Sequence, residues 1–244
     1  MRSRFDPRPI AERIWGEVGY KPPLPRDLIQ PMMETFDAAV ILIPRLSITA
    51  VNQWLGERGR QGIGAYRDRS LRACLLARRG FGLIFVDGTM ELEERRFAVA
   101  HELAHFFAHY LELRRRAIAR FGDQILPVLN DERHPTTVER LSEIIQQVPL
   151  GSFQDFLVRS DAGEPSGVII DIETEADLIA LELLAPCAEV VRTTPPGSLR
   201  TDSLQKDFGL PAWAAREWAR FINDMEPRSD PVIVGLERAI KKKS

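Results

Sequence analysis

The 244-residue chain lacks the features that mark secreted, membrane-embedded or nucleic-acid-coating proteins. It has only two cysteines, Cys74 and Cys187, too few for a disulfide framework and too far apart for a Cys-x-x-Cys metal pair. No stretch approaches the roughly 18 uncharged apolar residues of a membrane-spanning helix, and residues 1–10 have no apolar signal-peptide core. A formal net charge of −2 argues against general binding to nucleic acid or membrane surfaces. We therefore expect a cytoplasmic protein with no membrane association.

The remaining composition is that of a folded domain, with 44% hydrophobic residues. Residues 38–44 form a continuous β-rich run, and residues 71–77 and 81–86 flank the short turn of a hairpin. The other periodic segments have helical spacing. The sequence therefore predicts an α+β fold that is predominantly helical, with a small antiparallel sheet and a C-terminal helical appendage.

Histidine is also scarce, yet three of the four histidines lie within residues 95–110, RRFAVAHELAHFFAHY. His101, Glu102 and His105 form an H-E-x-x-H pattern in a run without glycine or proline. Residues four apart share one face of a helix, so both imidazoles can bind one zinc ion, and Glu102 lies beside them as a candidate general base. So short a pattern also arises by chance. The apolar surroundings favour the metal hypothesis, because buried His and Glu side chains need partners.

The third histidine of this stretch, His109, does not complete a three-histidine site. The metzincin pattern requires a glycine and a further histidine, and Ala108 and Leu111 occupy those positions. We expect His109 to be a partly exposed helix residue. The third ligand must then come from elsewhere in the chain.

Residues 171–186, DIETEADLIALELLAP, form a second helical segment with acids at its start. Glu173 and Asp177 are four apart and share a face, and the small Ala176 and Ala180 allow close approach to another helix. Two histidines and one glutamate are the ligand set of thermolysin-type zinc sites, in which Asp177 would orient a ligand histidine. Alternatively, these acids only stabilise the helix N-terminus through its dipole.

The two segments together resemble the ImmA/IrrE family of bacterial and phage metallo-endopeptidases. That family pairs R-F-x-x-A-H-E-x-x-H with a later E-x-x-A-(N/D)-x-x-A-x-x-L-L-x-P, and residues 96–105 and 173–186 have these patterns. The resemblance implies a gluzincin-type, zincin-like metallopeptidase with zinc bound by His101, His105 and Glu173 and with Glu102 as catalytic base. It further implies a protein or peptide substrate, with a transcriptional repressor as one candidate.

The long gap between the two segments indicates an inserted helical region over about 111–168. We assign residues 1–192 to the metallopeptidase domain and residues 193–244 to a small C-terminal helical region. An endopeptidase also needs a group that stabilises the oxyanion, and Tyr66, Tyr110, His109 and His134 remain equal candidates.

Two other functions stay open at this stage. In the first, the zinc site is structural or sensory and the protein is a non-catalytic regulator that binds a partner. In the second, less favoured, the helix pair around Gly209 binds DNA, because its outline resembles a helix-turn-helix. Trp213 and Trp218 in its second helix are better suited to packing than to reading bases.

Overall fold

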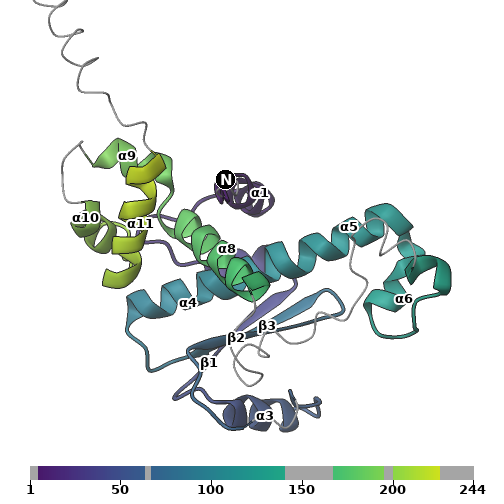
Figure 1. The fold of residues 1–244 in the computed structure, drawn as a ribbon. Helices are drawn as coiled ribbons and strands as arrows, with labels where there is room; N and C mark the ends of the chain where they lie inside the picture. Colours follow the sequence, from purple (N-terminus) through teal and green to yellow (C-terminus); the bar gives the residue numbers. More distant parts are fainter. Residues whose placement is uncertain (1–4, 64–66, 141–166, 195–199, 226–244) are drawn as a thin grey trace, which may run out of the picture.

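The computed structural model describes residues 5–63, 67–140, 167–194 and 200–225. Helices dominate these residues, and the strands form one small sheet (Figure 1), so the predicted α+β class is confirmed. No helix in the described part of the chain combines the length and apolarity needed to cross a membrane. The elements in chain order are α1 (Arg8–Val18), α2 (Ile29–Thr35), β1 (Ala38–Ile43), α3 (Ile48–Gly56), β2 (Ala73–Arg78), β3 (Phe81–Asp87), α4 (Leu92–Ala104), η1 (His105–Leu111), α5 (Glu112–Phe121), η2 (Asp123–Ile125), α6 (Leu126–Leu129), α8 (Gly167–Leu184), α9 (Cys187–Thr193), α10 (Arg200–Lys206) and α11 (Ala212–Met225).

The sheet has the strand order β1-β3-β2. β2 and β3 form the predicted antiparallel hairpin, whose turn holds Arg79 and Gly80 at φ 54° and 86°. Two successive residues with positive φ are typical of the tight turns that match strand twist. β1 pairs with the other side of β3 in the parallel direction, which requires a crossover, here formed by α3 and β2. The sheet is therefore mixed, and the antiparallel pairing expected from the sequence holds for its hairpin half.

The sheet separates two apolar layers. Figure 1 shows α3 on one side of the sheet and the continuous helix α4–η1–α5 on the other. The α3 side buries Val51 and Leu55 against Phe85, and the α4 side buries Leu75 and Ile84. Alternate strand residues thus face different helices, as the two-residue period of a strand requires.

The long helix lies very close to the sheet at one point. A side-chain carbon added at Gly82 of β3 would lie 2.7 Å from Cε2 of Phe106. Phe106 is 1% exposed and stacks on Tyr110, whose hydroxyl accepts a hydrogen bond from the N–H of Gly80 at 2.6 Å. The hairpin is therefore fixed against the helix that carries the H-E-x-x-H pattern.

The helix α8 lies across α4 (Figure 1), and both helices present small residues that are fully buried. Ala100 and Ala104 of α4 and Ala176 and Ala180 of α8 have no exposed surface. Small side chains allow two helix backbones to approach closely, as the alanine spacing in the sequence predicts. This crossing brings residues 173–177 of α8 close to the histidines.

The C-terminal helices pack into the same apolar cluster as α4 and α8. Trp218 of α11 is fully buried and donates a hydrogen bond from Nε1 to the carbonyl of Ala185 at 2.7 Å. The exposed face of α11 carries Arg216, Glu217 and Arg220, and Arg220 pairs with Glu217 at 3.0 Å. This mixed charge differs from the basic face that DNA phosphates require.

Part of the predicted insertion is described. The helix α5 extends the long helix, and a small separate cluster forms from Ala117, Ile125, Val128 and Leu129. Thr136 and Glu139 form a capping box, with N–H···O distances of 2.7 and 3.3 Å. Residues 141–166 of the predicted insertion lie outside the described residues.

Candidate metal centre

Three side chains that are distant in sequence meet where α8 crosses the long helix. The Nε2 atoms of His101 and His105 are 3.0 Å apart. The carboxylate of Glu173 faces both, with Oε2 at 3.4 Å from Nε2 of His101 and Oε1 at 3.4 Å from Nε2 of His105. The possible metal-ligand atoms of these three side chains all lie within 4.8 Å of one another. Within the described part of the chain, no other group of three or more His, Cys, Asp or Glu residues converges in this way.

The donor set and its spacing fit a zinc ion. Two ligands of a tetrahedral zinc ion, each about 2.0–2.1 Å from the metal, lie about 3.3–3.4 Å apart. The three separations of 3.0, 3.4 and 3.4 Å are close to that value. Two imidazoles and a carboxylate are also the ligands that catalytic zinc sites use while leaving one position open. The sequence prediction that His101, His105 and Glu173 come together is therefore matched by the geometry.

Asp177 lies where the helical spacing places it, on the outer side of His101. Its Oδ1 is 2.8 Å from Nδ1 of His101. Because an ionised carboxylate can only accept, the proton of this contact belongs to Nδ1 and leaves the lone pair of Nε2 directed toward Glu173 and His105. An acidic partner on the far ring nitrogen is the usual way in which a metal-binding histidine is held.

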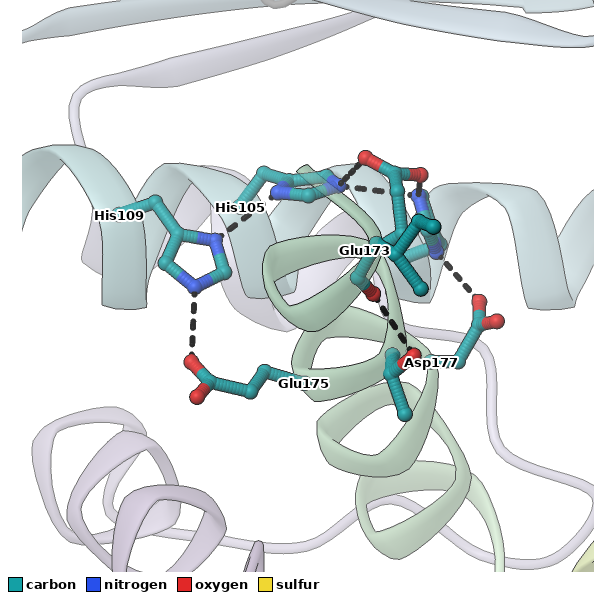
Figure 2. A network of polar contacts seen from close by, with 8 residues as sticks. His105, His109, Glu173, Glu175 and Asp177 are labelled. Carbon is teal, nitrogen blue, oxygen red and sulfur yellow. Dashed lines mark hydrogen bonds and ion pairs between the residues drawn. The ribbon is translucent and has the colours of Figure 1, made fainter. Parts of the chain in front are cut away.

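The second histidine of the pattern has a different partner. Nδ1 of His105 is 2.9 Å from Nδ1 of His109, and Nε2 of His109 is 3.4 Å from Oε2 of Glu175 (Figure 2). The expectation that His109 is a partly exposed helix residue is confirmed, since its side chain is 13% exposed in η1. The sequence analysis did not foresee that both of its ring nitrogens are bonded. The sequence does indicate this contact, because His109 follows His105 by four residues, just as His105 follows His101.

Glu102 is buried, with 8% of its surface exposed. Burial raises the pKa of the Cys74 thiol on β2, and the negative charge of Glu102 raises it further. Glu102 follows His101 directly in α4, whose residues contact β2, an edge strand of the sheet. A buried carboxylate on the residue after a candidate metal ligand is suited to proton transfer.

The four candidates for oxyanion stabilisation have different locations. The hydroxyl of Tyr110 is bonded to the hairpin turn, and burial raises the pKa of this group. His109 is bonded to His105 and Glu175. His134 is exposed in the segment after α6, and Tyr66 lies outside the described residues.

Comparison with known proteins agrees with the motif. Residues 64–126 match the model of peptidase family M78, described as the IrrE N-terminal-like domain. No curated protein and no solved structure matches the chain significantly. The matched segment contains the β2–β3 hairpin and the whole H-E-x-x-H helix, whereas Glu173 lies beyond it. Residues 64–126 are therefore similar to the IrrE N-terminal-like domain of this peptidase family, in agreement with the resemblance to ImmA/IrrE proteins found in the sequence.

Proposed function

We propose that this protein is a zinc-dependent endopeptidase that hydrolyses peptide bonds of a protein substrate. The observation that carries the proposal is the convergence of His101, His105 and Glu173. Glu102, which follows His101 in the H-E-x-x-H pattern, is buried. The peptidase family matched by residues 64–126 supports the same reaction class. The two buried, unpaired cysteines, Cys74 and Cys187, agree with a reducing cytoplasm as its compartment.

In this proposal each site residue has one task. His101, His105 and Glu173 would hold zinc, and Asp177 fixes the ring of His101. Bound zinc would supply a Lewis acid that makes water more acidic and polarises the scissile carbonyl. Glu102 accepts a proton from the water whose oxygen attacks the carbonyl carbon. It then delivers this proton to the departing amine nitrogen as the C–N bond breaks.

The hairpin edge supports an extended peptide as the substrate. The N–H of Asp87 donates to the carbonyl of Arg72 at 2.9 Å, so these two residues form a hydrogen-bonded antiparallel pair. Hydrogen-bonded pairs alternate along such a ladder, and the register pairs Ala73, Leu75 and Ala77 at the intervening positions. The main-chain N–H and C=O groups of these three residues therefore point away from β3, where an extended peptide can pair with them.

A transcriptional repressor remains our candidate substrate, on the strength of the family resemblance alone. The experiment combines metal analysis with proteolysis of unfolded model proteins and of candidate repressors. We expect about one zinc per chain, cleavage that stops after chelation, and recovery when zinc returns. Cleavage that continues at an unchanged rate after zinc has been removed would refute the proposal.

The same assay can test how the substrate binds. Peptides of one cleavable sequence are compared with versions that are N-methylated at alternate backbone nitrogens. If β2 pairs with the substrate, methylation at one set of alternate positions raises KM, because it removes the peptide N–H groups that would donate to β2. Methylation at the other set leaves KM unchanged, because those N–H groups point away from β2. Equal effects of both sets would exclude edge pairing.

A further inference from the structure

We infer that His109 and Glu175 are positioning residues that fix the ring of His105 through a hydrogen-bond chain from α8 to η1. This inference rests on the proposed zinc site and adds two residues that neither the H-E-x-x-H pattern nor the later glutamate motif includes. It concerns the side of His105 that faces away from Glu173. Figure 2 shows the two contacts in sequence, from Glu175 to His109 and from His109 to His105.

The chain of contacts is short and shielded from solvent. His105 is fully buried, and the side chain of His109 is 13% exposed. The contact between the two Nδ1 atoms is 2.9 Å, within the usual range of a hydrogen bond. The contact from His109 to Glu175 is 3.4 Å, and the Glu175 side chain is 39% exposed. The inner contact should therefore contribute more than the outer one.

The chemistry of the three groups assigns every proton along this chain. The ionised carboxylate of Glu175 can only accept, so Nε2 of His109 carries a hydrogen and donates it. In a neutral imidazole the other nitrogen then accepts, so Nδ1 of His109 accepts from Nδ1–H of His105. His105 is left with its lone pair on Nε2, the atom that faces Glu173 at 3.4 Å. The chain thus selects the tautomer and the ring orientation that metal binding requires.

The arrangement depends on how α8 meets the long helix. His101, His105 and His109 follow one another at four-residue steps on α4 and η1, and the π-helical segment η1 begins at His105. π-helical turns occur frequently at functional sites, where they redirect side chains. The middle of α8 carries the facing acids. Asp177 bonds His101, Glu173 faces His105, and Glu175 bonds His109. Both proposed histidine ligands are thereby held at Nδ1, one directly by a carboxylate and one through another histidine.

The test measures zinc affinity by competition with a chelator of known affinity, together with ring nitrogen chemical shifts by NMR. His109→Leu removes the acceptor for His105 and should weaken zinc affinity about 10- to 100-fold, the usual loss for an outer partner of a metal ligand. His109→Asn keeps an amide oxygen near the position of Nδ1 and should recover most of the affinity. His134→Asn removes the other histidine outside the site, which is exposed, and should leave zinc affinity unchanged.

A double-mutant cycle separates a positioning role from a general loss of stability. If Glu175 acts through His109, Glu175→Leu weakens zinc binding in the wild-type background and adds nothing in the His109→Leu background. Additive effects, or a wild-type zinc affinity in His109→Leu, would overturn the inference. Thermal unfolding of the zinc-free variants identifies any change that comes only from lost stability.

The NMR readout keeps this inference separate from the proposed function. Ring nitrogen shifts of the zinc-free protein report whether His105 carries its hydrogen on Nδ1, as inferred, or on Nε2, which would refute the inference. A wild type that binds no zinc would instead refute the proposed function. If the wild type binds zinc and the His109 variants bind it with the same affinity, only the positioning role is refuted.

Discussion

Three carboxylates in the middle of α8, Glu173, Glu175 and Asp177, have different partners on the facing helix. Glu173 faces the Nε2 atoms of His101 and His105 at 3.4 Å, and Asp177 contacts Nδ1 of His101 at 2.8 Å. Glu175 reaches His109 instead. A group that binds a metal directly contributes more to affinity than a group that orients a ligand. The three acids should therefore differ in how strongly their removal affects zinc binding.

We predict that Glu173→Ala weakens zinc affinity by more than the 10- to 100-fold typical of an outer partner, because it removes one of three ligands. Asp177→Ala should fall within that range. Thr174→Ala, at an exposed position on the same helix, is the control and should bind zinc like the wild type. Chelator competition measures all three. A larger loss for Asp177→Ala than for Glu173→Ala would mean that the assignment of Glu173 as ligand is wrong.

For single residues, the sequence predicts which side chains share a helix face better than it predicts which side chains they contact. Four-residue steps predict that His101 and His105 share one helix face and that Glu173 and Asp177 share another. That Glu173 meets the two histidines follows from the family resemblance, and the geometry agrees with it. The partner of His109 depends on where another helix crosses, which local spacing does not encode. Glu175, two residues after Glu173 on the same helix, is the carboxylate that this crossing brings to His109.

At the scale of elements, the position of the H-E-x-x-H helix depends on its contact with β3. Gly82 allows the ring of Phe106 to lie directly against the strand. The turn of the hairpin is held by Tyr110, one helical turn further along. A displacement of this helix from the sheet would also displace His105, which precedes Phe106.

We predict that Gly82→Ala destabilises the protein by about 1–3 kcal/mol, because the added carbon would force Phe106 and its helix away from the sheet. Gly16→Ala in α1 is the matched control, since no atom lies within 4 Å of the added carbon. That control should stabilise by about 0.5–1 kcal/mol through the better helix propensity of alanine. Denaturant unfolding measures both changes. Equal effects of the two substitutions would contradict the close packing at Gly82.

Local signals in the sequence predict several elements well. The β2–β3 hairpin rests on pairing between strands that are close in sequence. The start of α3 is capped by Ser47, whose side chain accepts a hydrogen bond from the N–H of Ala50 at 3.2 Å. The capping box of Thr136 and Glu139 is likewise a contact between near neighbours. The parallel pairing of β1 with β3 does not rest on contacts between near neighbours. It depends on a crossover between distant segments, which residue patterns alone do not specify.

At the scale of the whole molecule, a buried arginine joins the N-terminal segment to the helix that carries Glu173. Arg26 donates from Nη1 to the carbonyl of Leu183 at 2.8 Å and from Nη2 to Glu189 at 2.9 Å. Its guanidinium also lies over the ring of Trp15, 5.4 Å from the ring centre. The predicted boundary between residues 192 and 193 stays a prediction, although α10 and α11 contribute to the same apolar cluster as α4 and α8.

We predict that Arg26→Met lowers the free energy of unfolding by about 1–3 kcal/mol, because a buried carbonyl loses its donor. Arg192→Met removes another arginine that pairs with Glu189, at 3.9 Å and with 73% of its side chain exposed. Exposed pairs contribute little, so this control should change stability by less than about 0.5 kcal/mol. Thermal and denaturant unfolding of both variants provide the comparison. A loss in Arg192→Met as large as in Arg26→Met would show that the buried bonds of Arg26 are not what stabilises this junction.

The central claim is that Glu102 transfers protons while His101, His105 and Glu173 hold the metal. Glu102→Gln keeps the shape of the side chain but cannot accept the proton, so zinc content and affinity should match the wild type. Cleavage of the same substrate should fall by at least the 10²- to 10⁴-fold that general-base catalysis typically contributes. The decisive measurement is therefore zinc stoichiometry and turnover in the same samples of wild type and Glu102→Gln. Retained zinc with turnover lost is the predicted result, and a variant that cleaves as fast as the wild type, or a zinc-loaded wild type that cleaves no protein, would contradict the account.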